Sequence, residues 1–160
     1  MSGELDALQQ TLAGEHAAVH AYGVLAGRAA PLGLSSFRAG LTAAYDAHLT
    51  RRDDLRALVT ADGGVPVAAE PSYLMPPDLT TRSAIAEEAL RTEQACVGQY
   101  AALVAAGGPG PARSWAVTAL GESALTALGF GGEPAPLPGV TVIPAPTPAP
   151  ESSAASASAS

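Results

Sequence analysis

The sequence predicts an all-α protein, a four-helix bundle followed by a low-complexity tail. Apolar residues recur at steps of three and four in four separate stretches, which is the period of helices with one buried face. Glycine and proline stand between these stretches and end each of them. From residue 133 onward proline alternates with small residues, and residues 152–160 are only Ala and Ser. This composition cannot build a packed core.

The first two helices are expected to form an antiparallel pair. The first covers residues 4–28 and is ended by Pro31 and Gly33. The second begins at Ser35 or Ser36, either of which can cap it, and ends near residue 61 before two glycines. The short turn between the helices predicts that they pack side by side in opposite directions.

The segment 62–79 is predicted to be a strap along the bundle. Four prolines exclude a regular helix, and in extended form the segment is long enough to follow a helix of about 35–40 Å. Its apolar side chains are expected to be buried against the helices. These are Val65, Val67, Tyr73, Leu74 and Met75.

Two more helices complete the predicted bundle. The third begins after Thr80 or Thr81 and runs to about residue 106, and the fourth covers residues 111–128. On the fourth helix Trp115, Thr118, Glu122 and Leu125 are expected to share the buried face. We expect one domain over residues 1–132 and a mostly disordered tail over residues 133–160.

Composition and charge limit the classes of function. The formal net charge of -7 argues against binding to nucleic acid or to anionic membranes. The N-terminus lacks the pattern of a signal peptide, and no stretch reaches the roughly 20 apolar residues of a membrane span. Cys96 is the only cysteine, so an internal disulfide cannot form. We therefore expect a cytoplasmic protein, and the absence of Lys and Asn suggests a GC-rich bacterial genome.

Each predicted helix carries one metal-ligand type of side chain on its apolar stripe. These are Glu15, His48, Glu93 and Glu122. At about 1.5 Å of rise per residue, each lies roughly 15–19 Å from the end of its helix. In an antiparallel bundle with a returning strap, all four are expected near mid-height. An isolated buried carboxylate is unfavourable, so these glutamates need a cation, a proton or strong donors beside them.

Three stretches resemble the ferritin-like superfamily, and in particular a small bacterial ferritin-like family of unknown function. They are residues 14–23 (GEHAAVHAYG), 44–53 (AYDAHLTRRD) and 93–100 (EQACVGQY). The resemblance covers about residues 4–128. It implies a four-helix bundle with a long crossover and, in many members, a di-iron carboxylate centre with two Glu and two Glu-x-x-His pairs.

The resemblance to the di-iron motif is partial. Glu15, Glu93 and Glu122 match glutamates of the motif, and His48 matches one histidine. Tyr45 stands where the resemblance implies a bridging Glu, and Leu125 stands where it implies the second His. A complete di-iron centre is therefore not expected.

Two interpretations of the buried site remain open. In one, Glu15, His48, Glu93 and Glu122 hold a metal, for which iron or manganese is suitable, and support a metal-dependent oxidoreductase or an iron-handling protein. In the other, which we favour, they form a polar network in a non-catalytic or weakly metal-binding bundle. Arg51 or Arg52 would neutralise the glutamates. Hydroxyls of Tyr22, Tyr45 and Tyr100 would bond to them.

Three further residues and one surface call for an interpretation. His16 and His20 share a helix face, and we interpret them as a surface or groove pair because no third ligand is fixed nearby. Cys96 is interpreted as a small buried apolar side chain. A homodimer through an exposed face of the bundle is a further hypothesis.

Overall fold

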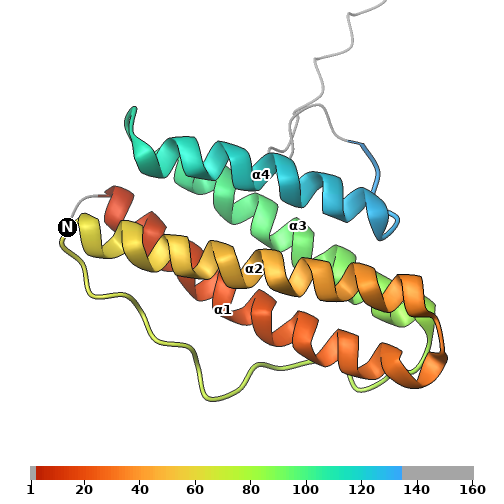
Figure 1. Ribbon diagram of the computed structural model, residues 1–160. Coiled ribbons are helices and arrows are strands. Elements are labelled where there is room, and N and C mark those ends of the chain that lie inside the picture. Colours follow the sequence, from red (N-terminus) through yellow and green to blue (C-terminus); the bar gives the residue numbers. More distant parts are fainter. Residues whose placement is uncertain (1–2, 135–160) are drawn as a thin grey trace, which may run out of the picture.

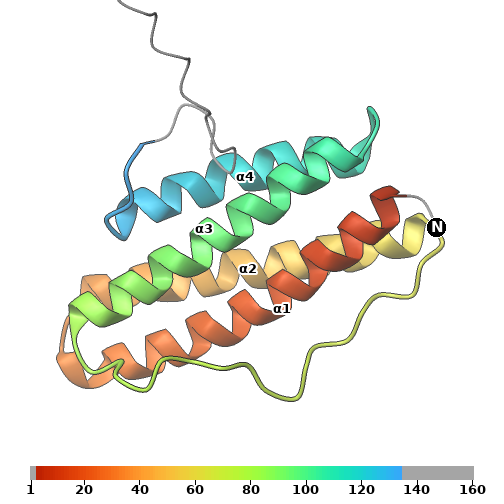
Figure 2. The ribbon, with the colours of Figure 1, turned by 180° about the vertical axis from the view of Figure 1, so that it is seen from behind.

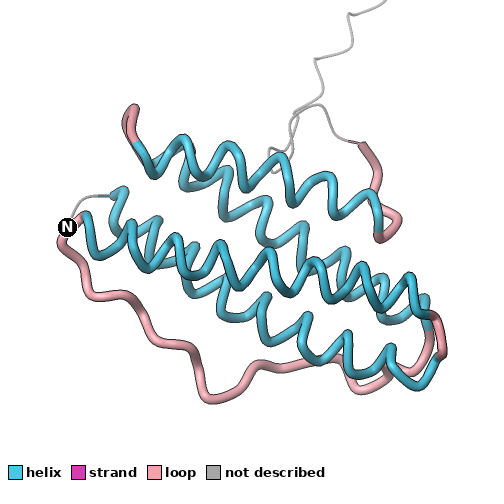
Figure 3. Tube along the Cα trace, viewed as in Figure 1, coloured by secondary structure: helices cyan, strands magenta, loops and turns pink. Residues whose placement is uncertain are grey.

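Four long helices make up the fold. The computed structural model describes residues 3–134. The helices are α1 (Gly3–Ala29), α2 (Ser35–Ala61), α3 (Arg82–Ala106) and α4 (Pro111–Gly129), and the short 3-10 helix η1 (Ala30–Leu32) follows α1. Within these residues there is helix and loop but no strand (Figure 3). The predicted all-α class and the four helical stretches are confirmed.

The bundle consists of two helical hairpins. The α1–α2 hairpin turns through η1 and Gly33, whose φ of 69° is readily adopted only by glycine. The α3–α4 hairpin turns between Ala106 and Pro111. α1 packs against both α2 and α3, and α4 packs mainly against α3 (Figure 1). In both views of the ribbon α4 lies along the edge of the bundle opposite to α1 (Figure 2).

The connection between α2 and α3 runs along α1, as predicted for the strap (Figure 2). Gln9 holds it through two hydrogen bonds: its Nε2 donates to Val65 O at 2.7 Å, and its Oε1 accepts from Val67 N at 2.9 Å. Leu79 anchors the far end in the core with an exposed fraction of 3%. The strap therefore returns the chain to the end of the bundle at which α2 begins.

Three apolar side chains of the strap are not buried, contrary to the expectation. Val65 is 86% exposed, Val67 is 38% exposed, and Leu74 is fully exposed. Tyr73 and Met75 are half-buried. The reason is that the strap contacts the bundle along one edge only, so side chains on its other edge face water.

Two apolar clusters fill the two ends of the bundle. One contains Tyr22, Leu25, Leu41 and Ile85, and the other contains Leu8, Leu12, Leu55 and Leu103. The polar centre described below lies between them along the helices. Buried leucines thus surround the centre on both sides and keep water from it.

Local signals explain where the helices begin. Thr81 caps α3, as predicted, because its hydroxyl oxygen accepts from Ala84 N at 3.2 Å. The predicted serine cap of α2 is wrong, since Leu34 occupies the cap position and Ser35 is already helical. Pro111 begins α4 at a position where its missing N–H has no intrahelical acceptor.

The buried face of α4 differs from the prediction. It consists of small residues: Ala112, Ala116, Ala119, Ser123 and Ala127. Glu122 and Leu125 lie outside it, with exposed side-chain fractions of 59% for Glu122 and 69% for the Leu125 residue. α4 is apolar on several faces, so the 3–4 pattern alone does not identify the one that packs against α3.

None of the described helices is long and apolar enough to cross a membrane. The predicted tail over residues 133–160 lies, from residue 135 onward, outside the described residues.

Candidate functional site

The centre of the bundle holds a histidine between two glutamates. Glu15 on α1, His48 on α2 and Glu93 on α3 are all fully buried. Nδ1 of His48 lies 2.7 Å from Oε2 of Glu15, and Nε2 lies 3.2 Å from Oε1 of Glu93. The predicted meeting of Glu15, His48 and Glu93 at mid-bundle therefore matches their positions in the structure.

Three hydroxyls also donate to these two carboxylates. The Tyr100 hydroxyl donates to Oε1 of Glu15, and the Ser123 hydroxyl donates to Oε2 of Glu93. The Tyr22 hydroxyl lies 2.7 Å from Oε1 of Glu93. All four carboxylate oxygens thus have a protein donor, which burial of two carboxylates requires. We refer to these residues, Glu15, Tyr22, His48, Glu93, Tyr100 and Ser123, as the interior network.

Protonation in the interior network follows from its geometry. Burial lowers the pKa of His48, but the hydrogen bonds to Glu15 and Glu93 and their charges outweigh it and raise that pKa to about 9. Burial raises the pKa of Glu93, while its bonds to His48, Ser123 and Tyr22 hold it below the ordinary value. His48 is therefore an imidazolium at neutral pH, and both of its N–H groups donate to carboxylates.

Arg51 lies beside the interior network without bonding to its glutamates. It is 5% exposed, and its guanidinium carbon lies 5.8 Å from the centre of the Tyr100 ring. Its Nη2 donates to Oε2 of Glu122 at 3.1 Å. The expected neutralisation of Glu15 or Glu93 by direct pairing with an arginine is thus not found. His48 itself is the bonded cation.

Other predicted site residues lie outside the interior network. Arg52 pairs with Asp53 at 2.9 Å on the surface. Tyr45 packs against the apolar cluster around Tyr22 instead of bonding to a glutamate. Glu122 is on the outer part of α4, where it meets only Arg51 among the charged groups named above. Glu122 and Ser123 are adjacent in the sequence and therefore point in directions about 100° apart around α4. Ser123 faces the centre of the bundle, and Glu122 does not.

His16 and His20 hold the strap. Nε2 of His16 lies 3.0 Å from Val67 O, and the ring of His20 lies 5.3 Å from that of Tyr73. The interpretation of these histidines as a surface or groove pair agrees with these contacts. Their partners are the strap backbone and an aromatic ring.

Cys96 brings a potential metal ligand to the interior network. One ligand atom from each of Glu15, His48 and Cys96 lies within 4.8 Å of the other two, and all three residues are buried. Burial raises the pKa of the Cys96 thiol well above its ordinary value, and the charges of Glu15 and Glu93 raise it further. At neutral pH the side chain is therefore a thiol, in keeping with its interpretation as a small buried group.

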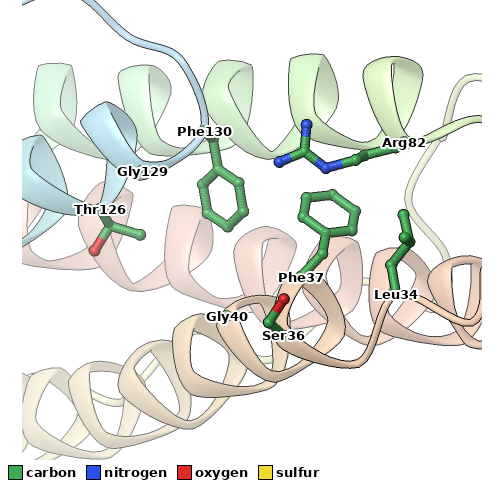
Figure 4. A pocket seen from close by; sticks show the side chains of 8 residues that line it. All are labelled: Leu34, Ser36, Phe37, Gly40, Arg82, Thr126, Gly129 and Phe130. Atoms are coloured by element: carbon green, nitrogen blue, oxygen red, sulfur yellow. The ribbon is translucent and has the colours of Figure 1, made fainter.

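A separate pocket of about 430 Å³ lies between the start of α2 and the end of α4 (Figure 4). Its aromatic walls are Phe37 and Phe130, and the Arg82 guanidinium carbon lies 4.9 Å from the centre of the Phe37 ring. The residues that line it include no carboxylate, histidine or thiol. The pocket thus offers an apolar surface, one cation and the hydroxyls of Ser36 and Thr126, with no carboxylate or imidazole beside them to act as a base.

Ser123 is the member of the interior network that sequence reasoning missed. It sits in a run of small residues at steps of three and four, Ala112, Ala116, Ala119, Ser123 and Ala127. That run could have identified the buried face of α4, because a close helix–helix contact favours small side chains. The prediction instead placed Glu122 on the buried face, because Glu is a more typical metal ligand than Ser.

Comparisons with known proteins place the chain among proteins of unknown function. The sequence profile of a family described as a domain of unknown function (DUF4439) matches residues 7–142. The chain is similar to the crystal structure of rv2844, a conserved hypothetical protein from Mycobacterium tuberculosis, with 28% identity and a TM-score of 0.73. That similarity covers 80% of this chain and 94% of the other. No functionally curated protein matches the sequence.

Proposed function

The chain belongs to the DUF4439 family of domains of unknown function, and we propose that it is a ferritin-like bundle with a structural, non-catalytic interior. In this proposal the interior network fixes how the four helices meet, and the domain acts through its surface. The long strap between two helical hairpins and the residues shared with the ferritin-like superfamily support the assignment. The bacterial origin of the similar protein supports a bacterial family.

The observation that carries the proposal is the saturation of the central carboxylates. Oε1 and Oε2 of both Glu15 and Glu93 accept hydrogen bonds from protein groups. The imidazolium of His48 supplies a positive charge between them, and the guanidinium of Arg51 lies close by. The carboxylate oxygens that a substrate or a metal would use are thus occupied by hydrogen bonds from the chain itself.

A di-iron centre does not fit these residues. Tyr45 replaces the bridging glutamate that the resemblance implies, and it packs in an apolar cluster. Leu125, at the position of the second histidine, is 69% exposed. Ser123, the α4 residue that reaches the centre, is a weak ligand in place of a carboxylate or an imidazole. We therefore derive no di-iron chemistry for this chain.

The distribution of the interior network over the helices suggests its structural role. α1 contributes Glu15, α2 contributes His48, α3 contributes Glu93 and α4 contributes Ser123. A shift of any helix by one residue would leave a buried carboxylate without its donor, which costs several kcal/mol. The interior network thus selects one register of the four helices over sliding alternatives that apolar packing alone would tolerate.

A second candidate function is the binding of a single metal ion by Glu15, His48 and Cys96. Their ligand atoms lie within 4.8 Å of one another, and a thiolate, an imidazole and a carboxylate together suit zinc or iron better than manganese. Binding would require His48 and Cys96 each to lose a proton, so the affinity would rise with pH. If the bound metal were iron, the protein could be a metal-dependent oxidoreductase or an iron-handling protein, which is the alternative stated from the sequence.

Elemental analysis of protein purified without chelator separates the two candidates. The structural proposal expects far less than one ion per chain and the same melting temperature with and without EDTA. It also expects both ring nitrogens of His48 to show protonated ¹⁵N shifts at neutral pH. Near-stoichiometric zinc or iron that is lost in Cys96→Ser, while Cys96→Ser remains folded, would overturn the proposal in favour of the metal site.

A further inference from the structure

The pocket between the start of α2 and the end of α4 combines apolar walls with one guanidinium (Figure 4). Its volume of about 430 Å³ falls within the range of about 300–1,000 Å³ that is typical of sites for small organic molecules. Such sites are lined mainly by aromatic and aliphatic side chains, and a few polar groups fix the orientation of the ligand. None of the residues that line the pocket belongs to the interior network, so its role is a separate question.

Two aromatic rings form the walls of the pocket. Phe37 on α2 and Phe130 after α4 meet edge to face, with ring centres 6.4 Å apart and an angle of 82° between the ring planes. Both residues are half-buried, and both pack against the apolar cluster around Tyr22. This packing holds the rings in place while part of each remains accessible from the pocket. The walls are therefore a preformed apolar surface for the body of a ligand.

Arg82, the first residue of α3, supplies the cation of the pocket. Its guanidinium carbon lies 4.9 Å from the centre of the Phe37 ring, and Figure 4 shows the guanidinium over that ring and next to Phe130. The ion pairs within residues 3–134 involve His48 and other arginines, so no carboxylate of this part of the chain neutralises Arg82. Stacking on a ring restricts the guanidinium, which can then bind a carboxylate with a smaller loss of entropy.

The surroundings of the pocket are poor in carboxylates although the chain as a whole is acidic. Residues 16–45, which include the end of α1 and the start of α2, contain Arg28 and Arg38 but no Asp or Glu. The residues that line the pocket include no carboxylate either. At physiological ionic strength, exposed charges more than about 8 Å away are largely screened, so the net charge of -7 acts only weakly here. The local charge therefore favours an anion.

The first turn of α2 adds hydrogen-bond donors to the pocket. Leu34 occupies the cap position and makes no side-chain hydrogen bond to the helix. The first N–H groups of a helix have no intrahelical acceptor, and they favour negative charge. Ser36, in the same turn, lines the pocket and carries a hydroxyl. These donors supplement the guanidinium of Arg82, which remains the only full charge in the lining.

We propose that this pocket binds a small monocarboxylate with a compact apolar body. The carboxylate pairs with Arg82, and the apolar body packs against Phe37 and Phe130. One cation in the lining matches one negative charge on the ligand. No carboxylate or imidazole lies in the lining to act as a base, so the ligand is bound and not converted. This inference goes beyond the proposed structural role of the interior network and does not depend on it.

An NMR titration of the full ¹⁵N-labelled chain with 3-phenylpropanoate tests the proposal. We expect saturable shifts of the backbone amides of Ser36, Gly40 and Gly129, which line the pocket, with a dissociation constant of about 1 mM or below. The alcohol 3-phenylpropan-1-ol has the same apolar body without the charge, and it should bind at least about fivefold more weakly. Acetate has the charge without the apolar body, and it should also bind more weakly.

Two pairs of variants assign the binding to this pocket. Arg82→Gln should lower the affinity for 3-phenylpropanoate to that for the alcohol, whereas Arg38→Gln, which removes a charge outside the lining, should change it by less than about twofold. A Cβ at Gly40 would meet no atom within 4 Å, so Gly40→Leu places its side chain in open space at the pocket and should abolish binding of both probes. Gly27→Leu is the matched control, because Gly27 is an exposed helical glycine with equally open space outside the pocket.

Several outcomes would overturn the proposal. One is the lack of saturable shifts up to about 10 mM 3-phenylpropanoate, and another is equal affinity for the acid and the alcohol. Equal losses of affinity in Arg82→Gln and Arg38→Gln would show that the anion responds only to the general charge of this end of the bundle. Binding that survives Gly40→Leu would place the ligand elsewhere. The metal content and the ¹⁵N shifts of His48 test the interior network separately, so the two proposals can fail independently.

Discussion

Nδ1 of His48 donates to Oε2 of Glu15 across 2.7 Å, and this bond joins the two helices of the first hairpin at the middle of the bundle. The same ring reaches Glu93 of the second hairpin through Nε2 at 3.2 Å. One side chain thus connects three helices. Its positive charge lies between two buried carboxylates, so the loss of its proton affects the whole centre.

The first prediction concerns alkaline pH. The pKa of His48 is about 9 in the folded chain, and its ordinary value, which applies to the unfolded chain, is 6.5. A raised pKa means that the stabilisation is fully present below pH 6.5 and is lost as the pH rises through about 9. We expect the free energy of unfolding, measured by urea titration, to fall by about 3 kcal/mol over this range.

His48→Gln is the control for the alkaline prediction. This variant should be less stable at neutral pH, and its stability should be nearly independent of pH over the same window. A wild type whose stability stays constant up to pH 9 would show that His48 is neutral in the folded protein.

The second prediction concerns Ser123, the α4 member of the interior network. Ser123→Ala removes the donor to Oε2 of Glu93 and should reduce the free energy of unfolding by about 1–3 kcal/mol. Ser114→Ala changes the same residue type on the same helix at an exposed position, so it should change stability by less than about 0.5 kcal/mol. Equal effects in thermal unfolding would contradict the role assigned to Ser123.

The third prediction concerns the contact between Gly14 and Gln99. A Cβ at Gly14 would clash with Oε1 of Gln99, so Gly14→Ala forces that side chain to move. Oε1 of Gln99 is buried and accepts no hydrogen bond within the described residues. The atoms displaced are the end of a flexible side chain, so in the wild type we expect the cost of moving Gln99 to cancel most of the better helix propensity of alanine, and Gly14→Ala to change stability little.

A double-mutant cycle checks this contact. In a Gln99→Ala background the clash is absent, and Gly14→Ala should stabilise the protein by up to about 1 kcal/mol. The effect of Gly14→Ala on stability thus depends on the residue at position 99. If Gly14→Ala has the same effect in both backgrounds, the two side chains do not share this space.

The fourth prediction concerns the strap. Gln9→Ala removes both hydrogen bonds that hold Val65 and Val67 on α1, and we expect faster proteolysis and faster amide exchange within residues 62–79. Global stability should fall by only about 1–2 kcal/mol, because the core does not involve these bonds. Gln10→Ala, at the exposed neighbouring position, should leave the strap protected.

Much of the fold and part of the centre could be predicted from the sequence. The helix bounds follow from glycine, proline and a threonine cap, which act locally and are visible in the chain. Glu15 and Glu93 were identifiable because each interrupts an apolar stripe. The neighbours of Glu15 on its stripe include buried Leu12, and those of Glu93 include buried Val97. His48 was identifiable for the same reason, and the lengths of the helices place all three at one height.

The errors arose where several faces of an element look alike. On α4 nearly every side chain is small or apolar, so the choice between Glu122 and Ser123 depends on how α4 rotates against α3, which is a tertiary property. Arg51 or Arg52 was expected to neutralise Glu15 and Glu93, but His48 does so instead. The two N–H groups of its ring point in opposite directions and reach one carboxylate each, whereas an arginine side chain would approach both from one side.

The strap has a consequence for how the two hairpins depend on each other. It joins α2 to α3 without entering the centre, while the hydrogen bonds from His48 to Glu93 and from Tyr100 to Glu15 cross between the hairpins. A chain nicked near Leu74 should therefore stay assembled as two fragments at neutral pH. As the pH rises and the imidazole of His48 becomes neutral, the two fragments lose the main polar contact between them. In an alkaline titration we therefore expect the nicked protein to dissociate at a less alkaline pH than that at which the intact chain unfolds.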